Sequence, residues 1–202
     1  RGIVNGIDYD VFNPETDPDI VQNYNAKNFR KEKVKNKRAL QEELGLAKDD
    51  KKFMIGIVSR LTNQKGLDLI QCVMDEICTD DVQLVVLGTG DENYENMFRH
   101  YDWKYHDRVS AQIYYSEPLS HKIYAACDAF LMPSLFEPCG LSQLMALRYG
   151  TVPIVRETGG LKDTVWPYNE FEGTGTGFSF ANYNAHEMLN IIRYAKHIYY
   201  DK

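Results

Sequence analysis

The stretch Phe53-Met54-Ile55-Gly56-Ile57-Val58-Ser59 is apolar and rich in β-branched residues, so it predicts a buried β-strand. The segment 66–78 follows it and predicts a helix. Its apolar residues recur at helical spacing: Leu67, Leu69, Ile70, Val73, Met74 and Ile77. A strand followed by a helix is the unit that repeats in parallel sheets.

The same alternation continues towards the C-terminal end of the chain. Further strands are predicted at 82–87, 109–114, 129–132, 152–155 and 177–180. Further helices are predicted at 93–101, 119–126, 141–149, 161–165 and 186–199. Because apolar strands alternate with helices, the predicted fold class is α/β, with a Rossmann-like parallel sheet, helices on both faces and right-handed connections.

The first fifty residues are polar and show weak periodicity. We predict that residues 1–50 form an N-terminal extension and that residues 51–202 form the α/β core of one domain. Within the extension, 37–44 predicts a short helix that ends at Gly45. The run 27–38 holds seven Lys and Arg residues with a single acid, and we interpret it as a solvated helix face.

Length and charge limit the classes of function. The 202 residues are 44% hydrophobic, which fits one core, and the net charge of −6 argues against a nucleic-acid partner. No segment resembles a signal peptide or an 18-residue apolar span, so we expect a soluble protein without a membrane partner. The chain starts at Arg1, directly before the motif-like run 2–8, and we therefore expect a piece of a longer protein.

The four cysteines show no CxxC spacing, and three of them lie within or at the end of apolar runs. They are Cys72, Cys78, Cys127 and Cys139. This pattern predicts a reducing, cytoplasmic location and no metal site.

Polar or glycine-rich segments follow the predicted strands. They are 59–66, 88–91, 115–117, 134–143 and 157–160. In parallel sheets, ligands bind at the carboxyl ends of the strands, where the strand order reverses. The segments therefore predict one ligand-binding crevice.

Arg60 and Lys65 flank a tight loop that enters a helix at Gly66. Two fixed cations beside free amide groups suit a diphosphate, because Arg offers a rigid fork of donors and Lys a movable charge. The alternative is a pair of solvated loop cations, and the position after a buried strand favours the ligand site.

Glycines at two other loops leave two interpretations open. Gly88 and Gly90 either permit close approach of a nucleotide or make a tight turn; the third glycine of a dinucleotide-binding motif is missing, which disfavours an NAD-dependent oxidoreductase. Gly159 and Gly160 precede a short predicted helix, so their amides either face a phosphate or form a plain turn.

The acidic turn 134–143 carries Glu137 between Phe136 and Pro138. A carboxylate presented there can accept sugar hydroxyl groups, or it can serve as a partner for the N-terminus of the next helix. Cys139 is either a reactive thiol or a structural residue. Tyr115, at the end of its strand, can stack on a base or lie at the edge of the core.

Four motifs together resemble one family. They are Asn5-Gly6-Ile7-Asp8, Ser59-Arg60-Leu61-Thr62-x-Gln64-Lys65-Gly66-Leu67, Pro133-Ser134-x-Phe136-Glu137-Pro138-Cys139-Gly140-Leu141-x-Gln143-Leu144 and Thr158-Gly159-Gly160-Leu161-x-Asp163-Thr164-Val165. With them, the chain resembles bacterial glycogen synthase and plant starch synthase over essentially its whole length.

The resemblance implies a retaining glucosyltransferase that moves glucose from ADP-glucose to the non-reducing end of an α-1,4-glucan. It implies the C-terminal, donor-binding half of a two-domain GT-B enzyme, with the glucan held by a missing N-terminal domain. No cofactor beyond the donor is implied, and the fragment alone is expected to be inactive.

The resemblance also implies roles for single residues. Arg60 and Lys65 would bind the diphosphate and stabilise the departing ADP. The glucose would be lined by Glu137, Cys139, Gly140 and Leu141. The nucleotide would contact Tyr115 at the adenine, Ser142 on the phosphate side, and the glycine-rich turns with Gly88, Gly90, Thr158, Gly159 and Gly160.

Two positions depart from related enzymes. Met145 stands eight residues after Glu137, where many GT-B enzymes have a second Glu, and this fits a synthase. Glu157 stands where the family often has Lys or Arg. The alternative function is a noncatalytic nucleotide- or glucan-binding module of the same fold, which an upstream domain with a glycine-rich acceptor loop would disfavour.

Overall fold

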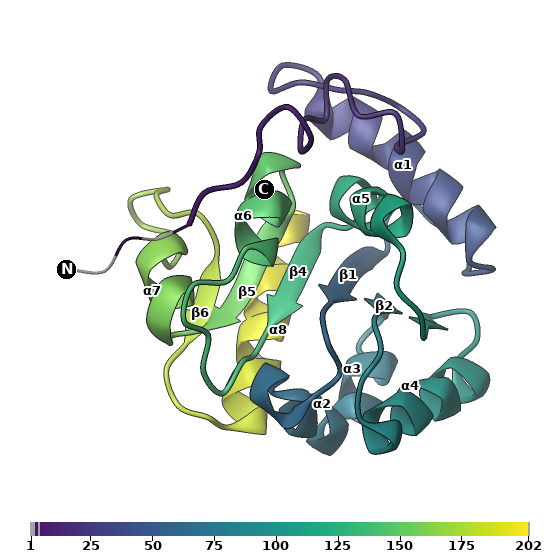
Figure 1. Ribbon diagram of the computed structural model, residues 1–202, viewed down its shortest axis with the longest axis vertical. Helices are drawn as coiled ribbons and strands as arrows, with labels where there is room; N and C mark the ends of the chain where they lie inside the picture. Colours follow the sequence, from purple (N-terminus) through teal and green to yellow (C-terminus); the bar gives the residue numbers. More distant parts are fainter. Residues whose placement is uncertain (1–2, 4, 202) are drawn as a thin grey trace.

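The computed structural model describes residues 3 and 5–201, and within them a sheet of six strands has the order β3-β2-β1-β4-β5-β6 (Figure 1). Every neighbouring pair is parallel. The strands are β1 Phe53–Val58, β2 Val82–Leu87, β3 Val109–Gln112, β4 Ala129–Met132, β5 Val152–Arg156 and β6 Phe178–Phe180. The predicted α/β class is therefore confirmed. Arg1, Gly2 and Val4 of the opening motif lie outside the described residues.

Helices precede, separate and follow the strands. They are α1 Phe29–Glu43, α2 Leu67–Cys72, α3 Met74–Thr79, α4 Glu92–Lys104, α5 Glu117–Ala126, α6 Ser142–Arg148, α7 Gly159–Thr164 and α8 Ala185–Asp201, with a 3-10 turn at Asn63–Lys65. The single helix predicted at 66–78 is wrong: Val73 has a φ of −122° and interrupts it. The strand predicted at 109–114 ends at Gln112, because Gln112 pairs with Leu87, the last residue of β2.

The core lies on both faces of the sheet because successive strand residues point in opposite directions. Ile55 and Ile57 of β1 pack with α2, α3 and α8, whereas Met54 packs with α1 and α5. Gly56 permits this second contact: a Cβ there would lie 2.7 Å from Cγ2 of Ile123 in α5. The central strand is thus buried on both sides.

The basic run 27–38 is not a solvated face throughout, and that interpretation is wrong for two of its lysines. Lys37 is buried, and its Nζ lies 2.6 Å from a carboxylate oxygen of Asp128 at the start of β4. Nζ of Lys33 donates to four oxygens: Tyr124 O, Ala125 O, Tyr149 O and Thr151 Oγ1. These carbonyls belong to the C-terminal ends of α5 and α6, where a cation is favourable.

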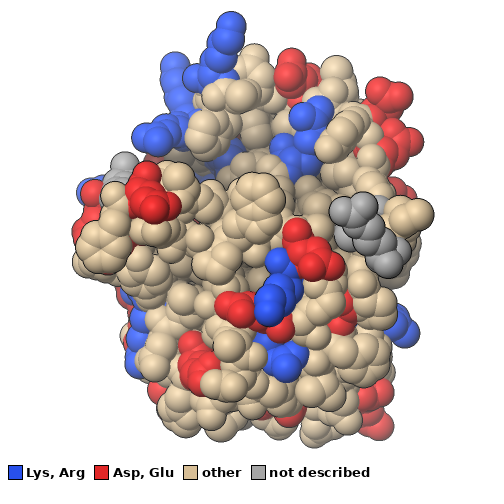
Figure 2. Space-filling view, turned by 90° about the vertical axis from the view of Figure 1, so that its left-hand side faces the viewer, with Lys and Arg blue, Asp and Glu red and all other residues tan. Residues whose placement is uncertain are grey.

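The remaining cations of the run agree with the prediction. They are the exposed residues Lys27, Arg30, Lys31, Lys35 and Arg38. In Figure 2, Lys and Arg side chains gather at the upper end of the molecule, where Figure 1 places α1. The helix also starts earlier than predicted, at Phe29, so one of its faces is available for the buried contacts of Lys33 and Lys37.

The polar segment before α1 contacts the core through a buried carboxylate. Asp17 lies 2.7 Å from Nδ1 of His121 and accepts a hydrogen bond from the Tyr149 hydroxyl. The hydroxyl of Tyr24 donates to the Tyr149 carbonyl oxygen at 2.7 Å. Burial raises the pKa of both tyrosines. Residues 14–24 thus pack on α5 and α6, and the division of the chain at residue 50 stays our proposal.

None of the helices in the described part of the chain is long and apolar enough to cross a membrane.

The buried ammonium of Lys33 gives a prediction for pH. Burial lowers the pKa of Lys33 from 10.5 to about 8, and Asp128 opposes the shift. Between these values the unfolded chain binds the proton more tightly, so this group raises the free energy of unfolding as the pH increases through the window. The stability of the wild-type chain relative to Lys33→Met should therefore rise by up to about 3 kcal/mol from pH 7.5 to pH 10.5.

Urea unfolding of both chains at several pH values measures this difference. Lys31→Met, an exposed position on the same helix, serves as the control and should show a flat difference. A flat difference for Lys33→Met as well would contradict the assignment.

Candidate functional site

The two loops at the centre of the sheet lie side by side where the strand order reverses. The chain leaves β1 towards β2 and leaves β4 towards β5, in opposite directions. The Leu135 amide donates to the Gln64 carbonyl oxygen at 2.9 Å. Gly66 has a φ of +74°, and a Cβ there would lie 2.0 Å from the carbonyl oxygen of Pro133. The loops after β1 and β4 are therefore in backbone contact.

An ion pair joins the two loops. Nζ of Lys65 lies 2.6 Å from a carboxylate oxygen of Glu137, and their side chains are 17% and 10% exposed. The Ser134 hydroxyl lies 3.4 Å from the same oxygen. The helix-capping alternative for Glu137 is wrong, because α6 begins at Ser142 with Leu141 as its N-cap residue and has no side-chain cap. The carboxylate instead faces the cation that the sequence singled out.

A pocket of about 120 Å³ lies at this junction. It is lined by Lys65, Arg60, Ser134 and Ser142 together with apolar residues from the ends of β1 and β4. Arg60 is exposed, and within the described part of the chain its guanidinium has no carboxylate partner. One paired and one unpaired cation thus face a small polar cavity, which suits a phosphate group.

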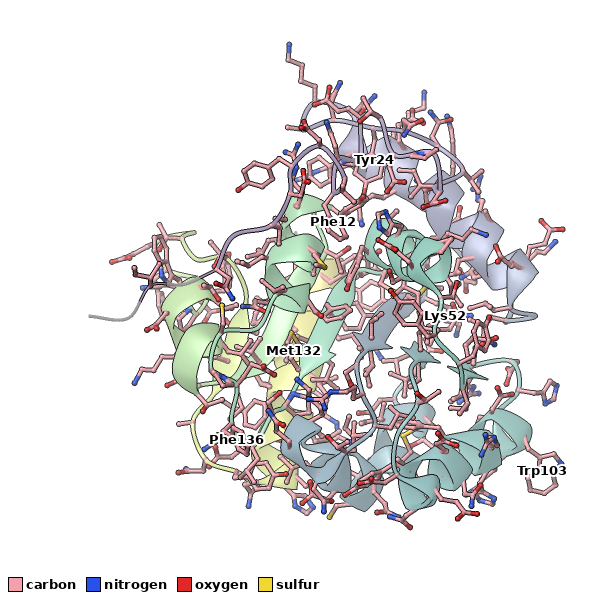
Figure 3. All side chains as sticks on the ribbon, viewed as in Figure 1. Phe12, Tyr24, Lys52, Trp103, Met132 and Phe136 are labelled. Atoms are coloured by element: carbon pink, nitrogen blue, oxygen red, sulfur yellow. The ribbon has the colours of Figure 1, made fainter. Side chains whose placement is uncertain are left out.

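A second pocket of about 390 Å³ adjoins the first, since Ser59 and Arg60 line both. Its walls include Phe12, Tyr114, Tyr115, Glu117, Tyr124 and Met145. Tyr115 is 86% exposed and forms part of the rim. In Figure 3, Met132 at the end of β4 lies between Phe12 above it and Phe136 below it. The pocket combines aromatic surface with hydroxyl groups and is large enough for a nucleoside.

The glycines after β2 permit contact between two loops of the protein itself. A Cβ on Gly88 would lie 1.8 Å from the Ser59 carbonyl oxygen, and one on Gly90 would lie 2.3 Å from that of Leu61. The Leu61 amide donates to the Thr89 carbonyl oxygen at 2.8 Å. Gly88 also lines the second pocket, so contact with a nucleotide stays a prediction for it.

Gly159 and Gly160 pack against the acidic turn. A Cβ on Gly159 would lie 2.2 Å from the Glu137 carbonyl oxygen, and one on Gly160 would lie 2.0 Å from that of Cys139. The Gly160 amide donates to the Glu137 oxygen at 3.1 Å, so this amide is already engaged within the protein. Thr158 precedes α7 as its N-cap residue without a side-chain cap. Ligand contacts of all three residues stay predictions.

The rest of the acidic turn is held by a residue to which the sequence assigned no role. Gln143 is fully buried, and its Nε2 donates to the carbonyl oxygens of Cys139 and Gly140 and to Oγ1 of Thr164. The half-buried Cys139 accepts a hydrogen bond from the Asn5 amide at its Sγ, at 3.3 Å. An amide side chain within the apolar helical run 141–147 was the available signal for Gln143.

Three further site residues have the following places. Gly140 has a φ of +71°, which favours glycine, and Leu141 is 39% exposed at the start of α6. Glu157 accepts a hydrogen bond from the Ser179 hydroxyl at 2.8 Å and is thereby directed towards β6.

Comparison with known proteins identifies relatives of this chain. The family model described as "Glycosyl transferases group 1" matches residues 39–199. The chain is 79% identical to a glycogen synthase of Lachnospira eligens over 200 residues, and 59% identical to one of Clostridium acetobutylicum over 201 residues. These matches cover 99% and 100% of the chain but 42% of each relative, so the chain spans less than half of their length.

Solved structures agree with the curated relatives. The catalytic domain of starch synthase IV from Arabidopsis thaliana, bound to ADP and acarbose, superposes with a TM-score of 0.91 at 38% identity, over 98% of this chain and 41% of that one. Anabaena HepE in complex with UDP-glucose has a TM-score of 0.66 at 21% identity, over 94% and 46%, which shows a shared fold only. The predicted resemblance to glycogen and starch synthases is confirmed.

The contact between the two loops can be tested with paired glycine variants. Gly66→Ala and Gly45→Ala both place a side chain at positive φ, but Gly45 has open space around it. Gly66→Ala should therefore lower the free energy of unfolding by about 1–3 kcal/mol more than Gly45→Ala, because its Cβ must displace the Pro133 carbonyl. Urea unfolding measures both, and equal losses would argue against a tight contact.

Proposed function

Because this chain belongs to the glycosyl transferases group 1 family, we propose that it is the donor-binding half of a glycogen synthase. The complete enzyme transfers glucose, with retention of configuration, from ADP-glucose to the non-reducing end of an α-1,4-glucan. The observation that carries the proposal is the pocket lined by Lys65, which pairs with Glu137, and by Arg60, which has no carboxylate partner among the described residues; this pocket adjoins one of nucleoside size.

The two cations act on the leaving group. In the reaction, the bond between the anomeric carbon of glucose and the donor phosphate breaks, and its electron pair stays on the phosphate oxygen of ADP. Arg60 and Lys65 stabilise the charge that develops there, and Ser142 contributes a hydroxyl on the phosphate side of the same pocket. The acceptor hydroxyl oxygen forms the new bond to the anomeric carbon, and its proton passes to the solvent.

Glu137 orients the sugar. Its carboxylate is largely buried, and it can accept hydrogen bonds from glucose hydroxyl groups while one oxygen faces Lys65. Cys139, Gly140 and Leu141 follow it on the same turn and line the glucose. The side of the turn towards α7 brings Gly159 and Gly160 close to the donor.

The larger pocket receives the nucleoside. Tyr115 stacks on the adenine from the rim, and Phe12 and Met145 form part of the apolar wall. A Met at position 145 places no charge beside the ribose. Support for ADP as the nucleotide comes from the starch synthase structure, which binds ADP.

We further propose that the glucan binds to a domain outside this chain and that the enzyme works in the cytoplasm. The chain covers 42% of its glycogen synthase relatives, which leaves room for an acceptor-binding domain.

The four cysteines are free, and burial raises the pKa of Cys78 to about 12, so this thiol is unreactive at neutral pH. The net charge of −6 disfavours a nucleic-acid partner or an anionic membrane surface.

Binding of ADP, without glucose, separates the roles of the charged residues. Arg60→Ala and Lys65→Ala should each weaken ADP binding by about 10- to 100-fold, because each removes a charge-assisted contact. Glu137→Gln should leave the affinity for ADP unchanged or raise it, because it releases Lys65 and removes a negative charge from the pocket. Titration calorimetry measures all three.

Arg99→Ala is the matched control, because Arg99 lies on α4 and pairs there with Glu95. It should bind ADP like the wild type. Unchanged affinity for ADP in Arg60→Ala and Lys65→Ala would show that the diphosphate does not bind in this pocket.

Transfer of glucose tests the function itself. The full-length protein should extend glycogen with ADP-glucose, and Glu137→Gln should lower kcat by about 10²- to 10³-fold, because the sugar loses an acceptor that orients it. Incorporation of labelled glucose is the readout, with UDP-glucose as the competing donor. A wild-type protein that binds ADP but transfers no glucose would identify a noncatalytic binding module instead.

A further inference from the structure

The turn that carries Glu137 is held from two sides. On the first side, the loop after β1 contributes Gln64, whose carbonyl oxygen accepts from the Leu135 amide at 2.9 Å. Lys65 of the same loop pairs with Glu137 at 2.6 Å. On the second side, at the end of β5, Nη1 of Arg156 donates to the carbonyl oxygen of Leu135 at 2.7 Å and to that of Ser134 at 3.3 Å. The turn thus has charged or amide partners on both flanks.

Arg156 is itself fixed by its surroundings. Its guanidinium lies over the ring of Tyr183, 5.5 Å from the centroid, and the Tyr183 hydroxyl donates to Asp68 on α2 at 2.5 Å. Nε of Arg156 is buried and has no hydrogen-bond partner among the described residues. A buried donor without a partner is unfavourable, and it marks a side chain whose orientation is set by another requirement. Here that requirement is the contact of Nη1 with the turn.

The arrangement does not make Arg156 a direct ligand of the donor. Neither Arg156 nor Glu137 lines the two pockets, but Glu137 pairs with Lys65 of the first pocket, whereas Nη1 of Arg156 is engaged by two backbone carbonyls of the turn. Its donor group faces the two backbone carbonyls immediately before the turn reaches Phe136 and Glu137. The effect of the residue on a ligand must therefore pass through the turn.

We propose that Arg156 is a positioning residue for Glu137, and this inference rests on the proposed function. By holding the carbonyl oxygens of Ser134 and Leu135 on the side of β5, Arg156 fixes the direction of the turn, so that the Glu137 carboxylate stands against Lys65 and faces the sugar. The two cations that face the diphosphate, Arg60 and Lys65, come from the other loop, with which Arg156 has no hydrogen bond among the described residues. Arg156 thus contributes to glucose transfer and not to nucleotide affinity.

A first experiment does not depend on turnover. Hydrogen–deuterium exchange of the full-length protein should be faster in the segment 133–139 of Arg156→Met than in the wild type, with β1 unchanged. Arg99→Met, on α4, is the matched control. Equal exchange in 133–139 would overturn the inference, whatever the protein catalyses.

A second experiment asks whether the effect passes through Glu137. In the full-length protein, Arg156→Met should lower kcat for glucose transfer by about 10- to 100-fold, with the Kd for ADP within about twofold of the wild type. Arg156→Lys should recover only part of kcat, because one ammonium lacks the fixed geometry of the guanidinium. A merely structural role would weaken ADP binding to the same degree as kcat.

The double variant Arg156→Met with Glu137→Gln completes the test. If Arg156 acts through Glu137, the double variant should be no slower than Glu137→Gln alone. Additive losses would overturn the positioning role while leaving the proposed function intact. Absence of transfer by the wild type would instead refute the proposed function, and the exchange experiment would still decide whether Arg156 holds the turn.

Discussion

The backbone contact between the loops after β1 and β4 is the constraint on which the crevice depends. Gly66 and Pro133 approach so closely that no side chain fits between them. This proximity brings Lys65 and Glu137 within 2.6 Å, although they are 72 residues apart in the chain. A buried carboxylate is unfavourable unless it is paired, so Lys65 of one loop offsets the cost of burying Glu137 of the other.

The charge balance of the crevice follows from this pair. Glu137 offsets one of the two cations, and Arg60 remains available to a ligand. In the proposed function, an anionic donor shares Lys65 with Glu137, whereas a sugar hydroxyl approaches the carboxylate without competing for charge. Phosphate and sugar contact different members of the pair in the proposed function, and the turn that presents Glu137 is hydrogen-bonded to Gln64, Gln143, Gly160 and Arg156.

The polar N-terminal segment belongs to the same structure as the crevice. Lys33 and Lys37 of α1 bind carbonyl groups and Asp128 at the opposite ends of the strands, and Asp17 contacts His121 and Tyr149. These contacts hold residues 14–43 on α5 and α6. They also place Phe12 in the wall of the larger pocket. Stability of the fold and shape of the proposed nucleoside pocket therefore depend on common contacts.

Sequence alone determined the parallel α/β fold, because apolar runs such as Phe53–Val58 and the helical spacing after them report burial through local periodicity. It also selected Arg60, Lys65 and Glu137, because polar residues directly after buried strands must lie at one edge of the sheet. Tertiary structure alone decided which partners they meet. Residues distant in the chain, or packing against other elements, decide four features that the sequence did not show. These are the burial of Lys33 and Lys37, the hydrogen bond of the Gly160 amide to Glu137, the interruption of the helix at Val73 and the contact of Arg156 with the turn. Local sequence patterns report the periodicity of burial. They do not identify a partner that only the folded chain brings within hydrogen-bond distance.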